Sequence, residues 1–320
     1  MATSGSTDYN ATRNDIITSA YGICGAIALG ESASNEEVQV AGDALQKMIK
    51  AWQAEGTQLW KNEEVVVFLN VGTEKYSLGP SGGNAALEQD LYVTKLNGAH
   101  SSGATSLTVD STTGMVASDK IGVVLTDGTL DWETISSVDS TTALTVTALD
   151  GAASDNGVVY TYTSTIARPL RLVNGRRRDW TGSDPVDTPF ANMVSRQQYM
   201  NQPNKSNAGL PTEGYYDPQI TDGELHIWPS PSSSSHTVHL TGQMPVEDID
   251  TASNNFDFPQ EWLEALEWNL AVRLAPRVGT PLNERSWLKN EALEKRMLLM
   301  AWDTEPTAVF FQPDFIGEEL

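Results

Sequence analysis

Histidine, carboxylate and cysteine side chains are the groups of this sequence that could do chemistry. His236 and His239 lie three residues apart in a predicted strand, where an odd spacing places two side chains on opposite faces. This spacing disfavours a metal ion shared by the two histidines. The single cysteine, Cys24, excludes a Cys-rich metal site and an intrachain disulfide. The sequence therefore predicts no metal-ligating residues.

The acidic residues are too numerous to indicate a catalytic pair. With 42 Asp and Glu side chains, a glycosidase-like pair could be drawn almost anywhere in the chain. Four glutamates are interpreted as solvated or helix-start charges: Glu36, Glu37, Glu63 and Glu64. The phosphate-binding motifs GxxxxGK[ST] and GxGxxG do not occur. We therefore predict no catalytic residue, no cofactor-binding residue and no enzyme activity.

A cluster of arginines stands out against an acidic background. The formal net charge is −22, which argues against a dedicated nucleic-acid binder because phosphate binding requires many Lys and Arg contacts. Residues 168–178 carry five arginines and no acid, whereas the segments on both sides are negative. The candidate partner-contact residues in this cluster are Arg168, Arg171, Arg176, Arg177 and Arg178.

Three interpretations of the arginine cluster stay open. Guanidinium groups bind carboxylates and phosphates, so the partner could be an acidic protein neighbour or a DNA backbone. Alternatively, the cluster is a solvated loop that pairs with the chain's own acids. The apolar C-terminal tail is a second candidate contact segment, because its large side chains would be exposed unless another subunit covered them. These side chains are Phe310, Phe311, Phe315 and Ile316.

Hydrophobic periodicity predicts helices near both ends of the chain. Apolar residues recur at helical spacing in four segments, which are 14–29, 35–55, 259–275 and 283–302. Three tryptophans fall on these apolar stripes and are expected in the core: Trp52, Trp262 and Trp302.

The segment between the predicted helices has the pattern of strands. Residues 64–70 and 75–78 are expected to pair as a hairpin. Within residues 97–163, short β-branched runs alternate with turn signals, which is typical of a small antiparallel barrel or sandwich.

These patterns predict an α+β fold class. We expect an antiparallel four-helix core made from N- and C-terminal helical hairpins, with β strands between them and an inserted small antiparallel β barrel or sandwich domain. The expected order is residues 1–92, an N-terminal helical hairpin plus strands; 93–167, the inserted β domain; 168–257, a β/loop region with the arginine cluster; 258–303, the C-terminal helical hairpin that completes the core; and 304–320, an extended C-terminal tail.

The chain resembles the head-to-tail adaptor (connector) proteins of short-tailed, podovirus-like bacteriophages. Residues Tyr21–Trp60 are similar to the N-terminal helical hairpin of that family, with a GES turn and the helix NEEVQVAGDALQKMIKAW. The segment GATSLTVDSTTGMVASDKIGVVLTDGTLDWETISSV resembles the β insert of its longer members. The segment FDFPQEWLEALEWNLAVRLAP resembles the second helical pair.

The resemblance implies a structural virion protein at the head–tail interface. Such adaptors form a homo-oligomeric ring, usually of twelve copies, which binds below the portal protein, extends the DNA channel and docks the tail nozzle or hub protein. Double-stranded DNA is expected to pass through the channel without specific binding, which agrees with an acidic chain that repels phosphates. Neither a cofactor nor a membrane is expected to take part.

Two other functions remain open. One is a virion-associated peptidoglycan-degrading enzyme, for which the abundant carboxylates and aromatic side chains are the support. The other is a tail nozzle or tube component, which would share the ring geometry but would bind the adaptor instead of the portal. The N-terminal segment MATSGSTDYN lacks the basic and apolar stretches of a signal peptide, so we expect synthesis in the host cytoplasm and a place in the virion.

Overall fold

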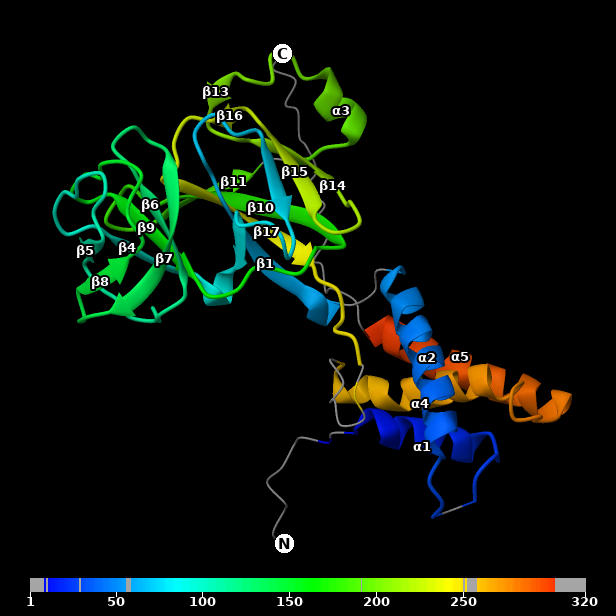
Figure 1. The fold of residues 1–320 in the computed structure, drawn as a ribbon. Coiled ribbons are helices and arrows are strands. Elements are labelled where there is room, and N and C mark those ends of the chain that lie inside the picture. The colour runs from blue at the N-terminus through cyan, green and yellow to red at the C-terminus, as the bar shows by residue number, and fades with distance from the viewer. Residues whose placement is uncertain are drawn as a thin grey trace, which may run out of the picture. The chain divides into compact units, whose positions relative to one another are not determined.

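The structure is a computed structural model in which the chain forms two compact units (Figure 1). The helical unit contains Met1–Trp60 and Val246–Leu320, and the β unit contains Lys61–Pro245. The structure describes residues 9, 11–28, 30–55, 59–190, 192–249, 251 and 258–302.

Segments from both ends of the sequence form the helical unit. Its α-helices are α1 (Arg13–Ile23), α2 (Asn35–Gln53), α4 (Leu263–Leu274) and α5 (Leu282–Trp302). Two short 3₁₀ turns, η1 (Leu59–Lys61) and η3 (Gln260–Trp262), lie at the start of the β unit and before α4. Within the described part of the chain, every helix is too short or too polar to span a membrane.

Side-chain caps start the first two helices of this unit. The Thr12 hydroxyl accepts a hydrogen bond from the backbone N–H of Asp15, and the Asp15 carboxylate accepts one from the backbone N–H of Thr12. Ser34 and Glu37 form the same reciprocal pair before α2. Each pair satisfies two backbone N–H groups that have no partner within the helix.

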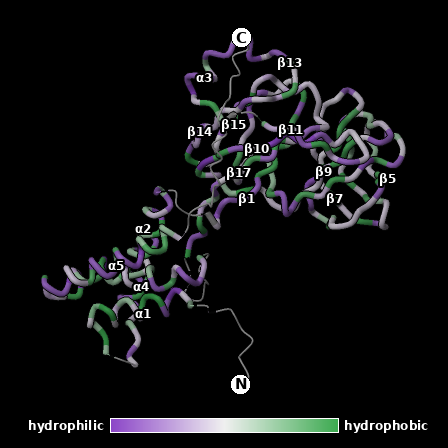
Figure 2. Tube along the Cα trace, turned by 180° about the vertical axis from the view of Figure 1, so that it is seen from behind, coloured by the Kyte–Doolittle hydropathy of each residue, from purple (hydrophilic) through white to green (hydrophobic). Residues whose placement is uncertain are grey.

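The helix α4 lies at the centre of the helical unit and packs against α1, α2 and α5. Its fully buried Leu266 and Leu270 belong to one apolar cluster with residues of the other helices, such as Ile17 and Ile49. Figure 2 shows hydrophobic residues recurring along these helices, α5 included. The indole of Trp262 lies 5.9 Å from that of Trp52, which adds aromatic packing to the cluster.

The described residues of the β unit form four sheets. The five-stranded sheet has the order β11-β10-β17-β1-β3, and the four-stranded sheet has the order β12-β14-β15-β2. The six-stranded sheet has the order β4-β9-β6-β7-β8-β5, and a small sheet pairs β13 with β16.

The strand bounds are as follows. The five-stranded sheet contains β1 (Asn62–Phe68), β3 (Ala85–Leu87), β10 (Arg171–Asp179), β11 (Val186–Phe190) and β17 (His236–Gln243). The four-stranded sheet contains β2 (Lys75–Leu78), β12 (Asn192–Met193), β14 (Glu213–Asp217) and β15 (Gly223–Trp228), and the two-stranded sheet contains β13 (Ala208–Gly209) and β16 (Ser230–Pro231). The six-stranded sheet contains β4 (Tyr92–Lys95), β5 (Ser106–Thr108), β6 (Lys120–Val124), β7 (Leu130–Val138), β8 (Ala143–Val146) and β9 (Val158–Tyr162). A 3₁₀ turn η2 (Glu88–Asp90) follows β3, and the short helix α3 (Arg196–Asn201) follows β12.

The strand β1 contributes to two hydrophobic clusters, one on each of its faces. Val65 and Val67 pack with Leu225 and Ile227 of the four-stranded sheet. On the other face, Phe68 packs with side chains of the six-stranded sheet, including Tyr160 at a ring separation of 5.3 Å. Because side chains alternate along a strand, one buried strand can join two layers.

The predicted fold class is wrong. Among the described residues, seventeen strands in four sheets stand beside five α-helices, so the protein is mostly β and is not a four-helix core that carries a small inserted domain. The physical reason is the shared packing of β1. It joins the six-stranded sheet, expected as a small insert, and the neighbouring strands into one large β unit.

Candidate functional site

A network of charged side chains covers one face of the five-stranded sheet. The sheet register places Arg176 of β10 opposite His239 of β17, and Arg178 opposite Asp187 of β11. Glu64 lies on β1, next to β17, and Glu88 follows β3 at the start of η2. Residues that are directly paired across strands share a face, so sheet order brings together side chains from five separate segments.

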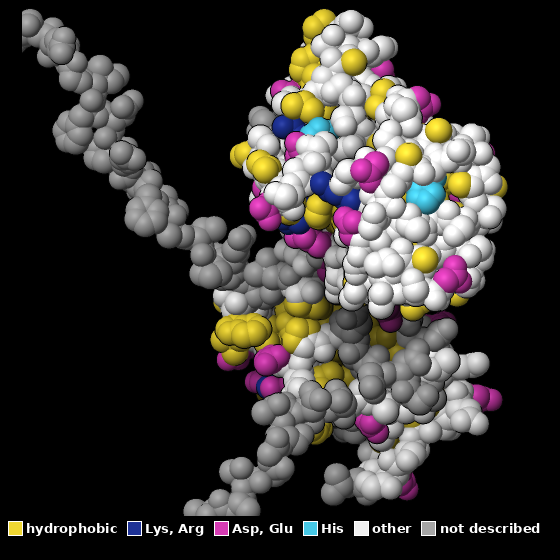
Figure 3. Space-filling view, turned by 90° about the vertical axis from the view of Figure 1, so that its left-hand side faces the viewer, with side chains coloured by type: hydrophobic (Ala, Val, Ile, Leu, Met, Phe, Trp, Pro, Cys, Tyr) yellow, Lys and Arg dark blue, Asp and Glu magenta, His cyan; other side chains and the backbone are white. Residues whose placement is uncertain are grey.

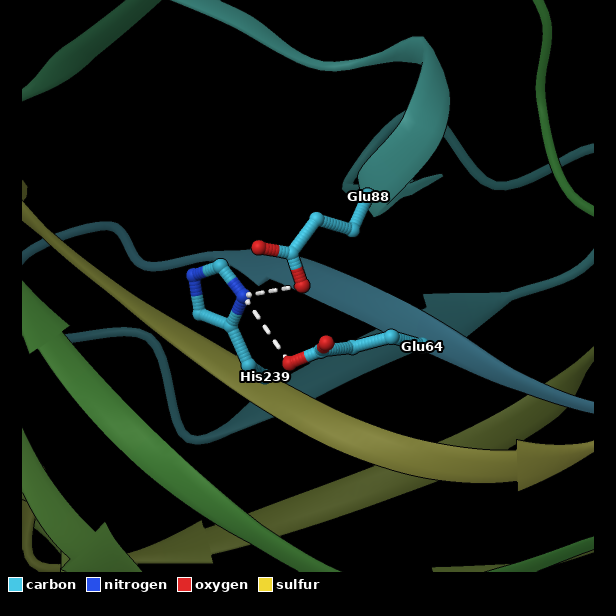
Figure 4. Close-up of side chains that lie close together, drawn as sticks. All are labelled: Glu64, Glu88 and His239. Carbon is cyan, nitrogen blue, oxygen red and sulfur yellow. Dashed lines mark hydrogen bonds and ion pairs between the residues drawn. The ribbon is translucent and has the colours of Figure 1, made fainter.

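The Nδ1 atom of the His239 imidazole points toward the carboxyl groups of both glutamates (Figure 4). Its Nδ1 atom is 3.4 Å from Glu88 Oε2 and 3.5 Å from Glu64 Oε1. Its Nε2 atom is 2.9 Å from the hydroxyl of Thr237, on the same face of β17. The His239 side chain is 0% exposed, whereas both glutamate side chains are 32% exposed. The cluster therefore has a buried nitrogen base and two carboxylates that solvent can reach.

Two arginines of β10 pair with the carboxylates. Arg176 forms an ion pair with Glu64, contacts Glu88 at 3.2 Å and places its Nε 3.0 Å from Asp187. Arg178 donates two hydrogen bonds to Asp187, at 2.7 and 2.8 Å, and one to Glu88 at 3.2 Å. Paired guanidinium groups offset much of the cost of placing carboxylates in a half-buried site.

Burial and neighbouring charges set the protonation of the cluster. Burial, together with the hydrogen bond to Glu88 and the charge of Glu88, raises the pKa of Glu64 to about 7 against the opposing effect of Arg176. Burial acts in the same direction on Glu88, but the hydrogen bond with Glu64 and the proximity of His239 and Arg176 bring its pKa below the ordinary value. Burial lowers the pKa of His239 to about 4, so this imidazole is neutral near pH 7. The two carboxyl groups therefore titrate as a coupled pair, and Glu64 is the partner that binds a proton more readily.

A shallow pocket of 280 Å³ opens at the carboxylates. It is lined by Asn62, Glu63, Glu64, Leu87, Glu88 and Gln89. Small ions and water can therefore reach the glutamates from solvent without any movement of β17.

The structure places the five arginines of the cluster in different environments. Arg176 and Arg178 are ion-paired within the chain, and Arg177 is buried and donates a hydrogen bond to the carbonyl of Pro211 at 3.2 Å. Arg171 is exposed at the start of β10, and Arg168 is half-buried before that strand. Figure 3 shows Lys and Arg side chains lying beside Asp and Glu side chains on one face. Three of the five arginines thus have partners within the β unit, on a strand and not in a loop.

The other predicted site residues lie outside the described residues. These are Phe310, Phe311, Phe315 and Ile316 of the C-terminal tail. Their role as partner contacts remains a prediction.

The two histidines of β17 lie on opposite faces of the strand, as their spacing predicts. His236 Nδ1 is 3.6 Å from Asp179, whereas His239 faces Glu64 and Glu88. The interpretation of Glu64 as a solvated charge is wrong, because its side chain is two-thirds buried in the network. No sequence signal joins Glu64, Glu88 and His239, since they come from three segments that meet only through strand pairing.

The segment Gly79–Gly83 fits the spacing GxSxG of a hydrolase nucleophile elbow. That motif requires a strand before the serine and a helix after it. Ser81 instead lies in the turn between β2 and β3, and its backbone N–H donates to Asp222 Oδ1 at 3.1 Å. The structural context of a nucleophile elbow is therefore missing at Ser81.

A second candidate site is an apolar row on α5. Leu293, Met297 and Leu298 are between 49% and 66% exposed, although they are large hydrophobic side chains. An open groove of 410 Å³ is lined by Asn290, Leu293, Glu294, Met297, Leu298 and Ala301. These positions repeat at three- and four-residue intervals, so they form one continuous stripe on the helix.

No family model matches the chain, and no curated protein matches it.

Proposed function

We propose that the protein is a structural subunit of a head-to-tail adaptor ring in a short-tailed bacteriophage. In this role it would bind below the portal protein, extend the DNA channel and dock the tail nozzle. The proposal starts from the resemblance of the helical segments to that family and adds a physical feature, the apolar row of α5, that self-assembly would explain.

The single observation that carries the proposal is that α5 has two apolar sides. Leu288 and Ala292 are 2% exposed, and α5 packs against α4. The row of Leu293, Met297 and Leu298 has no such cover among the described residues. Burying apolar area stabilises an assembly by about 25 cal/mol per Å², so an exposed row of this kind is typical of a surface that another molecule covers.

A second copy of the same chain is the occupant that we propose for this row. In a ring, every copy offers the same surfaces to its neighbours, so a single exposed apolar row can be covered in all subunits at once. The net charge of −22 also suits the wall of a DNA channel, because a negative wall repels phosphates and does not retain the duplex.

The test is the mass of the particle, measured by light scattering and by negative-stain imaging, for the protein alone and with portal rings of the same virus. We expect a ring for the wild-type chain, either alone or on the portal. The change Met297→Glu places a charge in the row and is expected to shift the particle to monomers with an unchanged circular dichroism spectrum.

A matched control is Ile220→Glu, which adds the same charge at an apolar residue of the β unit that is 96% exposed. This variant is expected to assemble as the wild type does. A wild-type chain that stays monomeric at every concentration and never joins a portal ring would overturn the proposal. A ring that binds the adaptor of the virus instead of its portal would assign the chain to the tail nozzle.

A further inference from the structure

We propose that Glu64, Glu88 and His239 form a binding site for a zinc-type divalent metal ion. The site lies in the β unit and does not depend on the ring proposed above. The sequence pattern does not indicate this site, because its three residues meet only through strand pairing.

The distances between the three side chains fit one small ion. All three candidate ligand atoms lie within 4.8 Å of one another. His239 Nδ1 is 3.4 Å from Glu88 Oε2 and 3.5 Å from Glu64 Oε1. Two ligands of a tetrahedral zinc ion, each bonded at about 2.1 Å, are separated by about 3.4 Å. The three ligand side chains therefore need only small movements to coordinate an ion at this point.

The types of donor atom select the class of metal. One imidazole nitrogen and two carboxylate oxygens suit zinc and similar transition ions, whereas Mg²⁺ and Ca²⁺ prefer oxygen ligands alone. Three protein ligands leave a fourth position for water. Glu64 and Glu88 also line the pocket bordered by Asn62 and Gln89, which gives an ion a path from solvent to these two ligands.

A second layer of side chains is present behind the histidine. Thr237 is fully buried, and its hydroxyl lies 2.9 Å from His239 Nε2 and accepts a hydrogen bond from Trp180 Nε1 at 2.9 Å. With the ion bound, His239 would donate its Nε2–H to Thr237 and present the Nδ1 lone pair to the metal. Such a partner fixes the tautomer and the orientation of a metal-binding imidazole.

The cation that now contacts both carboxylates is Arg176. Its Nη atoms touch Glu64 and Glu88, so a metal ion must replace these two contacts. The side chain is 33% exposed and also contacts Asp187 through Nε at 3.0 Å, so it retains a partner after displacement. Arg176 and the ion therefore compete for the same two oxygens.

Titration of the full-length, chelator-treated protein with ZnCl₂, followed by calorimetry, tests the site. We expect one ion per chain and an increase in the thermal unfolding temperature. His239→Gln and Glu88→Gln are each expected to weaken zinc binding at least tenfold, because each removes one of three ligands. Arg176→Gln is expected to strengthen it severalfold, because it removes the competing cation, whereas a purely structural ion-pair network would gain no zinc affinity from that change.

The control is His226→Gln, which removes an imidazole of β15 that lies beside Glu224 and outside the cluster. It is expected to leave zinc binding unchanged. Circular dichroism of each variant separates loss of a ligand from loss of the fold, and Co²⁺ absorption in the visible range reports four-coordinate geometry in the wild type. Absence of stoichiometric zinc binding, or binding that Glu88→Gln leaves intact, would overturn the proposal. Equal competition by Mg²⁺ would overturn the assignment to a zinc-type ion.

Discussion

At the scale of the residue, His239 shows how burial decides which groups of the network are charged. Its imidazole has no exposed surface, and burial lowers its pKa to about 4 even though Glu88 favours the protonated form. A protonated His239 would add a buried positive charge next to Arg176 and Arg178. The neutral ring leaves these two guanidinium groups to balance the carboxylates, which limits the desolvation cost of the cluster.

The thiol of Cys24 is expected to be unreactive in the folded protein. Burial raises its pKa to about 11, and its Sγ donates to the carbonyl of Ala271 at 3.1 Å. At pH 8 a thiol of pKa about 11 is ionised in only about one molecule in a thousand, against about one in four for a free thiol of pKa about 8.5. Because the thiolate is the nucleophile, Ellman's reagent should react at least ~100-fold more slowly than with the unfolded chain.

The control for this measurement is the same reaction in guanidinium chloride, which should release one equivalent of product per chain because the sequence has one cysteine. Rapid release of one equivalent from the native protein would show that Cys24 is accessible and that the pKa is not raised.

At the scale of the element, α4 and α5 differ in how completely they are covered. The helix α4 contacts three other helices, whereas α5 contacts α4 on one side and leaves the row of Leu293, Met297 and Leu298 exposed. An apolar helix face gains stability only when another surface covers it. The uncovered row is therefore the surface at which the proposed assembly would add stability.

Replacing Trp52 by alanine should destabilise the helical unit strongly. Trp52 is 5% exposed, contacts Trp262 and has the guanidinium carbon of Arg296 at 4.8 Å from its ring centroid. Trp52→Ala is expected to cost about 3–5 kcal/mol in the free energy of unfolding, because the site cannot close fully around the cavity. Urea unfolding followed by circular dichroism at a concentration that keeps the protein monomeric measures the loss.

The matched control is Trp302→Ala at the end of α5, where the side chain is 65% exposed. Its expected cost is within about 0.5 kcal/mol. Equal losses for the two variants would contradict the assignment of Trp52 to the core. The prediction that Trp302 belongs to the core, made from its position on the apolar stripe, is wrong because its side chain is largely exposed.

The sequence predicted individual elements better than their partners. The run 35–55 is close to α2 (Asn35–Gln53), and 75–78 is β2 (Lys75–Leu78). The expected hairpin between 64–70 and 75–78 is wrong, because β2 pairs with β15 and β1 pairs with β17 and β3. Local periodicity determines which residues face a core, but it does not identify a strand's partner more than a hundred residues away.

The same limit of local sequence patterns decides which candidate sites could be predicted. The arginine cluster was visible because its members are neighbours in the sequence, yet sequence alone did not show that Arg176 and Arg178 pair with Glu88 and Asp187. The group of Glu64, Glu88 and His239 was missed because it exists only after β1, β3 and β17 have paired. The exposed row of α5 was missed because periodicity alone does not show which apolar face is covered.

At the scale of the whole molecule, the excess of acid and the internal pairing of the arginines act together. The chain carries 20 basic and 42 acidic side chains, and three of the five clustered arginines have partners within the β unit. These three guanidinium groups are then less available to phosphates, and the excess of acidic side chains repels a DNA backbone. A structural subunit of a DNA channel would benefit from this property, since tight binding would slow the passage of the duplex.

We expect weak binding to duplex DNA. For a labelled duplex at physiological salt, fluorescence anisotropy should give a Kd weaker than about 10⁻⁴ M, because nonspecific binding depends on the number of cationic contacts. A micromolar Kd that weakens with salt and is lost in the double variant Arg168→Ala and Arg171→Ala would contradict this expectation. That result would show that Arg168 and Arg171, for which no ion pair is described, contact DNA.

The two points where the chain enters and leaves the β unit are neighbours. Asn62 of β1 pairs with Gln243 of β17, and the backbone N–H of Met244 donates to the carbonyl of Lys61 at 2.8 Å. Paired strands are only about 5 Å apart, so the polypeptide returns almost to its starting point after Lys61–Pro245. The β unit could therefore be replaced by another domain, or by a short glycine–serine linker, without changing the path of the remaining backbone.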